Sequence, residues 1–75
     1  MIVESIVAKA LNLNPADVTE TSSQDTIAEW DSMGHLSLVT NLEDHFRISI
    51  AIPDAMKMTS VAMIKSVLKD YGVAL

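Results

Sequence analysis

Apolar residues recur at helical spacing in three separate segments of this 75-residue chain, which restricts the fold to packed helices. The first segment predicts a helix over 2–12, with an apolar face made of Ile2, Val3, Ile6, Val7, Ala10 and Leu11. Asn12, Asn14 and Pro15 should end this helix, because asparagine favours turns and the residue before a proline avoids helical geometry. Pro15 can then begin a single short turn.

The second segment predicts a helix from about Ser32 to Phe46 with two different faces. The face expected to enter the core consists of Leu38, Leu42 and Phe46, flanked by His35 and Val39. The nearly opposite face consists of Met33, Leu36 and Thr40, with Ser37, Glu43 and Asp44 around them. Ser32 lies on the border, so a group attached to it could turn toward the core or toward a partner.

The third segment predicts a final helix, which Thr59 or Ser60 can cap and Gly72 can end in the left-handed conformation. Its apolar residues at helical spacing are Val61, Ile64, Val67, Leu68 and Tyr71. Residues 47–53 alternate like a strand, but the chain offers no second strand to pair with them. We therefore expect an extended connection there, followed by a short helical turn from Pro53 to about Met58.

Residues 16–30 show neither a helical nor a strand period, so they form a long first loop. Isolated apolar anchors interrupt it: Leu13, Val18, Ile27 and Trp30. Loops of this length in compact domains are usually functional or disordered. The anchors favour an ordered loop, which would hold Asp31 and Ser32 in a defined place. The expected fold class is all-α: one domain over 1–75, a small four-helix bundle with three main helices and one short helix.

Size and charge exclude several functional classes. A chain this small buries only about 60% of the surface of its unfolded form, which favours a binding or carrying role over an enzyme. Ten acidic residues against five basic ones give a net charge of -5 without a basic cluster, so nucleic acid would be repelled and basic protein patches attracted. The lack of cysteine suits a reducing compartment. Neither a membrane span nor a signal peptide is recognisable, so we expect a cytoplasmic monomer.

The tripeptide Asp31-Ser32-Met33 stands directly at the start of the second predicted helix. An acid, a hydroxyl and a thioether at this point are poor core material, so their placement indicates a role other than packing. A serine at a helix start is most often only an N-cap. The alternative is that Ser32 is a site of covalent modification.

Four stretches together resemble the acyl carrier proteins of fatty acid and polyketide synthesis. They are residues 30–36, 41–46, 52–54 and 59–61. The most specific match is to the Asp-Ser-Leu motif of that family, which appears here as Asp31, Ser32 and Met33. The resemblance covers essentially the whole chain, and it implies the four-helix fold of that family.

The resemblance implies that Ser32 is the attachment point of 4'-phosphopantetheine, which a phosphopantetheinyl transferase takes from coenzyme A. The thiol of this arm would carry an acyl group as a thioester. The free N–H groups and the positive dipole end of the second helix would favour the phosphate. The charge of Asp31 would oppose it, so we expect Asp31 to cap the helix or to bind the metal of the transferase.

The resemblance also implies that the exposed helix face contacts partner enzymes, which would be acyl-activating, condensing or acyl-transfer enzymes. The residues at matching positions are Met33, Leu36, Ser37, Thr40, Glu43 and Asp44. Methionine suits surfaces that must fit several partners. Gly34 and Ser37 stand where acids are common in the family, which favours a specialised fatty acid, polyketide or related pathway.

Other residues have plainer interpretations. His35 and His45 lack a third ligand, so we expect no metal site and place them at the core edge or surface. Trp30 is expected to anchor the loop. Three methionines are interpreted first as core residues and only second as contacts of an acyl chain sheltered between the helices: Met56, Met58 and Met63. Scattered acids are interpreted as solvated charges: Glu4, Glu20, Asp25, Asp54 and Asp70.

The sequence thus predicts a freestanding acyl carrier protein that presents thioester intermediates and is not itself a catalyst. Two alternatives stay open. A peptidyl or aminoacyl carrier of nonribosomal synthesis shares this chemistry, although the glycine pair common near its serine is replaced here by Glu29 and Trp30. An unmodified helical adaptor could instead use Met33 and Leu36 to bind one partner helix. The sequence does not specify the cargo or the pathway.

Overall fold

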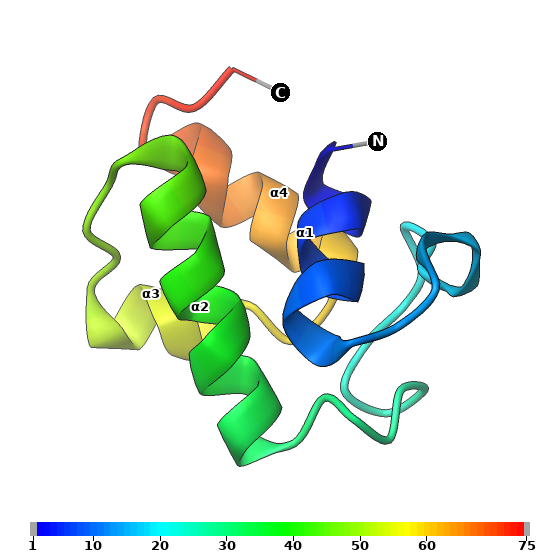
Figure 1. Ribbon diagram of the computed structural model, residues 1–75. Coiled ribbons are helices and arrows are strands. Elements are labelled where there is room, and N and C mark those ends of the chain that lie inside the picture. The colour runs from blue at the N-terminus through cyan, green and yellow to red at the C-terminus, as the bar shows by residue number, and fades with distance from the viewer. Residues whose placement is uncertain (1, 75) are drawn as a thin grey trace.

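The computed structural model describes residues 2–74 and contains no strand within them. Its elements in chain order are α1 (Ile2–Leu11), the 3₁₀ helix η1 (Pro15–Asp17), α2 (Ser32–Phe46), α3 (Ile52–Lys57) and α4 (Val61–Asp70) (Figure 1). The predicted all-α fold with three main helices and one short helix is confirmed. The short turn predicted at Pro15 is η1, and the first helix ends one residue earlier than predicted.

Side chains and backbone geometry explain where the helices begin and end. The carboxylate of Asp31 accepts a hydrogen bond from the N–H of Gly34 and so begins α2, and the Ser60 hydroxyl does the same for α4 by accepting from the N–H of Met63. After α2, Arg47 adopts the left-handed conformation with a φ of 55°. Gly72 follows α4 with a φ of 83°, as predicted.

The core lies between α1, α2 and α4. α1 packs against both α2 and α4, while α3 packs against α4 (Figure 1). The largest fully buried side chains are Leu38, Leu42, Met58, Ile64, Leu68, Val3, Val7 and Val61. Burial of each such side chain stabilises the fold by about 1.5–3 kcal/mol. α3 contributes no fully buried residue, so apolar packing holds it less firmly than the other helices.

Some predicted core positions are exposed. Met58 is fully buried, but the core interpretation is wrong for Met56 and Met63, which are 71% and 41% exposed. Met56 lies on the weakly buried α3, and Met63 lies outside the buried stripe of α4. Ile2 is also exposed, because it opens α1, where few neighbours can cover a side chain. Phe46 is only partly buried and meets the ring of His45 edge to face.

The long first loop is ordered and tied to the rest of the molecule. Val18 and Trp30 are buried, as the anchor interpretation predicts. The loop pairs with the segment before α4, because the N–H of Gln24 donates to the carbonyl of Thr59 at 3.0 Å. These contacts fix the path of the chain that leads to α2.

A partly buried ionic contact joins the same loop to α1 and α4. The ammonium of Lys65 lies 3.0 Å from a carboxylate oxygen of Glu4 and 3.5 Å from one of Glu20. Burial raises the pKa of Glu4, but the hydrogen bond from Lys65 and its charge outweigh this, so the pKa is lowered. The hydrogen bond to Glu4 raises the pKa of Lys65. The interpretation of Glu4 as a merely solvated charge is therefore wrong.

Candidate functional site

Ser32 is the first residue of α2, and its side chain is exposed. Asp31 acts as the helix cap, with its Oδ1 2.8 Å from the N–H of Gly34. The cap role expected for Asp31 is confirmed, and the N-cap alternative for Ser32 is wrong. Within residues 2–74, the Ser32 hydroxyl has no hydrogen-bond partner. It is therefore free for chemistry with an outside group.

Gly34 allows the loop to approach α2 closely. A Cβ at this position would overlap the carbonyl oxygen of Glu29 and would lie 2.9 Å from Cδ2 of Leu11. Real side chains essentially never tolerate such contacts, and the Glu29 oxygen belongs to the backbone and cannot rotate away. The glycine therefore has a packing function: it lets residues 29–31 pass beside the first turn of α2.

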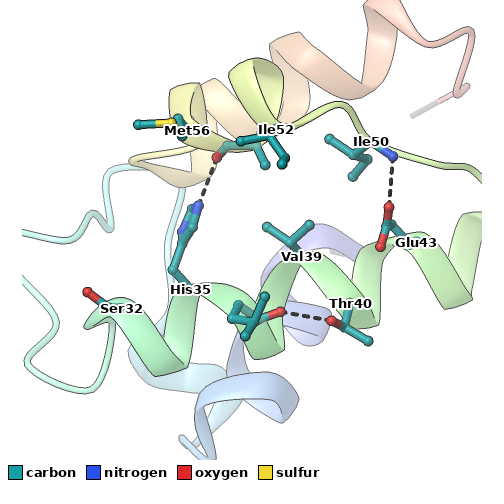
Figure 2. A pocket seen from close by; sticks show the side chains of 10 residues that line it. Ser32, His35, Val39, Thr40, Glu43, Ile50, Ile52 and Met56 are labelled. Carbon is teal, nitrogen blue, oxygen red and sulfur yellow. Dashed lines mark hydrogen bonds between the residues drawn. The ribbon is translucent and has the colours of Figure 1, made fainter.

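A groove of about 460 Å³ runs between α2 and α3, and Ser32 stands at one end of it (Figure 2). Its lining residues are Ser32, His35, Leu36, Val39, Thr40, Glu43, Ile50, Ile52, Ala55 and Met56. Ser32, His35, Val39 and Glu43 follow one another along a single face of α2, because they are spaced three or four residues apart. Figure 2 shows Val39 and Ile52 between the His35 end and the Glu43 end, where Ile50 lies, so the middle of the groove is mainly apolar.

His35 crosses the Ser32 end of the groove. Its Nε2 lies 2.8 Å from the carbonyl oxygen of Ala55 in α3, and its Nδ1 accepts from the indole N–H of Trp30 at 3.0 Å. Because an indole N–H can only donate, Nδ1 must be unprotonated, and Nε2 must donate to Ala55. His35 thus lies at the core edge, as predicted, and Trp30 is confirmed as an anchor.

Polar contacts also fix the opposite end of the groove. Glu43 accepts a hydrogen bond from the N–H of Ile50 at 2.8 Å. The Tyr71 hydroxyl donates to Asp54 at 2.6 Å and accepts from the N–H of Ala51 at 2.9 Å. The bond to Asp54 raises the pKa of Tyr71. Asp54 is therefore part of a structural contact, and its interpretation as a solvated charge is wrong.

The face expected to contact partners is largely exposed. Met33 is 83% exposed and Leu36 69%, and Thr40 and Asp44 are also exposed. Ser37 and Glu43 are half-buried, and each bonds within the chain: Ser37 donates to the carbonyl of Ala10 at 3.4 Å, and Glu43 accepts from Ile50.

Sequence reasoning missed Ile52 on this surface, and it interpreted Met56 as a core residue first and as a contact of the acyl chain only second. Ile52 and Met56 of α3 are 76% and 71% exposed and line the groove opposite α2. Their spacing of four residues within a helix that has no buried stripe is the signal that could have identified them. Together with Leu36 they border the groove with exposed apolar side chains.

No group of three or more histidine, aspartate or glutamate residues in the part of the chain that the structure describes is placed to hold a metal ion. Among residues 2–74, no helix is long and apolar enough to cross a membrane.

The fold can be compared with those of known proteins. No family model matches the sequence. Among solved structures, the chain is similar to the holo acyl carrier protein from Geobacter metallireducens, determined by solution NMR, with a TM-score of 0.79 and 23% sequence identity. The similarity covers 92% of this chain and 79% of that one. The chain thus has the fold of an acyl carrier protein, as the sequence resemblance implies.

Proposed function

We propose that this chain is an acyl carrier protein and that Ser32 bears a 4'-phosphopantetheine arm holding an acyl group as a thioester. One observation carries the proposal: an exposed serine hydroxyl, which has no hydrogen-bond partner among residues 2–74, opens onto an apolar groove in a chain with this fold. A carrier needs a reachable attachment atom and a shelter for its cargo, and the arrangement of Ser32 supports both. Asp31 leaves the hydroxyl free by serving as the cap.

The start of α2 suits a covalently attached phosphate. In the attachment step, the Ser32 oxygen would bond to the phosphorus next to the pantetheine of coenzyme A. The nucleotide portion would leave, and the serine proton would pass to a base on the transferase. The N–H groups of Ser32 and Met33 have no acceptor within the helix, and the positive dipole end favours an anion. The negative charge of Asp31 opposes this anion, so the function of Asp31 here is to cap α2.

The groove suits an acyl cargo. Its volume of about 460 Å³ lies in the range of small-molecule sites, and its middle is apolar. The eleven residue-to-residue steps of α2 from Ser32 to Glu43 correspond to about 16 Å. A chain attached near Ser32 could therefore extend along α2 with its hydrocarbon part against Val39 and Ile52.

Partner enzymes would dock around Ser32. The transferase and the acyl-activating, condensing or acyl-transfer enzymes would contact exposed residues of the two helices beside the groove: Met33, Leu36, Thr40 and Asp44 of α2, with Ile52 and Met56 of α3. The side chains of Ser37 and Glu43 are engaged in hydrogen bonds within the chain. Because Gly34 has a packing reason of its own, the proposal of a specialised pathway rests mainly on Ser37.

Intact-protein mass measurement tests the attachment. The chain is incubated with coenzyme A and a broad-specificity phosphopantetheinyl transferase. We expect a gain of one phosphopantetheine unit that disappears in Ser32→Ala and persists in the control Ser49→Ala, which changes another exposed serine. Loading assays with activated fatty acids and amino acids would then separate the acyl from the aminoacyl carrier. A mass that does not change would favour the unmodified adaptor, whose docking face would be Met33 and Leu36.

A further inference from the structure

His35 stands on the direct route from Ser32 into the apolar part of the groove. It lies three residues after Ser32 and four before Val39, on the same face of α2. Its side chain rises from α2 between these two residues and reaches the carbonyl oxygen of Ala55 on α3 (Figure 2). A chain that follows this face of α2 from Ser32 therefore meets this contact before it reaches Val39.

The imidazole is held from both sides. Trp30, which is 2% exposed, donates to Nδ1, while Nε2 donates to Ala55. Trp30 belongs to the loop and directly precedes the cap residue Asp31. One ring thus connects the loop that positions Ser32 with both walls of the groove.

The wall that His35 holds is the less firmly packed one. α3 contains no fully buried residue, and its side chains Ile52 and Met56 point largely into solvent. Its start is fixed separately, because Tyr71 bonds to the N–H of Ala51 and to Asp54. Release of His35 from Ala55 would loosen the middle of α3, between the bonds of Tyr71 at its start and the buried Met58 just after its end.

We propose that His35 is the gate of the groove: a positioning residue whose bond to Ala55 closes the Ser32 end and must break before cargo enters. The identity of the cargo as an acyl chain rests on the proposed function. A hydrogen bond of this kind shifts an equilibrium between closed and open forms by about two- to tenfold. The closed form lowers the apparent affinity for cargo by the same factor.

The test uses the unmodified chain and free octanoyl-pantetheine as the probe, so it does not depend on modification of Ser32. Binding is followed in ¹H–¹⁵N spectra and by the emission of Trp30, the only tryptophan in the chain. His35→Ala should bind the probe about two- to tenfold more tightly than the wild type. His35→Gln can accept from Trp30 and donate to Ala55, so it should restore wild-type affinity. The matched control His45→Ala changes an exposed histidine of α2 outside the groove and should have no effect.

Two spectroscopic signals show whether the bond between His35 and Ala55 breaks when the probe binds. They distinguish this opening from tighter binding that arises only because alanine leaves more space than histidine. In the wild type, bound probe should change the ¹⁵N shift of His35 Nε2 and the emission of Trp30, because the contact with Ala55 breaks. The proposal is overturned if the probe saturates while both signals stay constant, which would mean entry over the open rim of Leu36 and Ile52. It is also overturned if His35→Ala binds like the wild type, or if no variant binds at all. Should His35→Ala fail to fold, the wild type and His35→Gln still decide through these signals.

Discussion

The carboxylate of Asp31 accepts a hydrogen bond from the backbone N–H of Gly34 at 2.8 Å. This contact begins α2 and relieves the neighbouring Ser32 of the usual task of a serine at a helix start. The same glycine lets the carbonyl of Glu29 approach the helix. Asp31 before Ser32 and Gly34 after it thus hold the backbone in place, while the Ser32 hydroxyl remains free.

Removal of the cap should destabilise the protein and show whether Asp31 has a second role. Asp31→Ala should lower the free energy of unfolding by about 1 kcal/mol, whereas Asp31→Asn, which can still cap, should be nearly neutral. Urea denaturation measures both. If the Asn variant folds but is no longer modified by the transferase, Asp31 also binds the metal of that enzyme. Equal stability of Asp31→Ala and the wild type would contradict the cap.

A methyl group at Gly34 should have the opposite effect to that in an ordinary helix. Glycine to alanine in a helix interior usually stabilises by about 1 kcal/mol. Here the overlap with Glu29 should instead destabilise the fold by about 1–3 kcal/mol and slow the modification of Ser32. His45→Ala, at an exposed position of the same helix outside the groove, serves as the control. A stabilised Gly34→Ala variant would show that the loop does not pack as described.

The Tyr71 hydroxyl should hold the start of α3 in a pH-dependent way. Tyr71→Phe should speed amide hydrogen exchange at Ala51 and lower the melting temperature, because two hydrogen bonds are lost. The pKa of Tyr71 is raised by its bond to Asp54, so its contribution is complete below the pKa of the unfolded chain, about 10. It is lost as the pH rises through the folded value. The difference in melting temperature between Tyr71→Phe and the wild type should therefore shrink in alkaline solution. A difference that stays constant with pH would argue against the bond between Tyr71 and Asp54.

The pair of Lys65 and Glu4 should stabilise the fold except in acid. The lowered pKa of Glu4 means that its contribution is present above the pKa of the unfolded chain and is lost as the pH falls through the folded value. Lys65→Met leaves the half-buried carboxylate without this partner and should lower the melting temperature at about pH 7. Protonation of Glu4 should reduce that loss at about pH 3. Glu4→Gln is the control, because it should remove most of the dependence of the melting temperature on acid pH.

The sequence predicts those features that depend on local patterns. The bounds of α2 follow from its unbroken apolar period, and the anchoring of the loop follows from isolated residues such as Trp30. The groove could not be predicted in the same way, because its second wall depends on the path of the chain after Arg47. The bridge from His35 to Ala55 joins residues twenty apart, and no local pattern encodes it. For the same reason, the packing role of Gly34 became visible only in three dimensions.

The most direct test of the carrier role combines attachment and cargo in one measurement. The chain is incubated with octanoyl-coenzyme A and a broad-specificity transferase, and its intact mass is measured before and after treatment with hydroxylamine, which cleaves thioesters. We predict a gain of one octanoyl-phosphopantetheine unit, located at Ser32 by fragmentation, from which hydroxylamine removes only the octanoyl group. An unchanged mass, or the same gain in Ser32→Ala, would contradict the account.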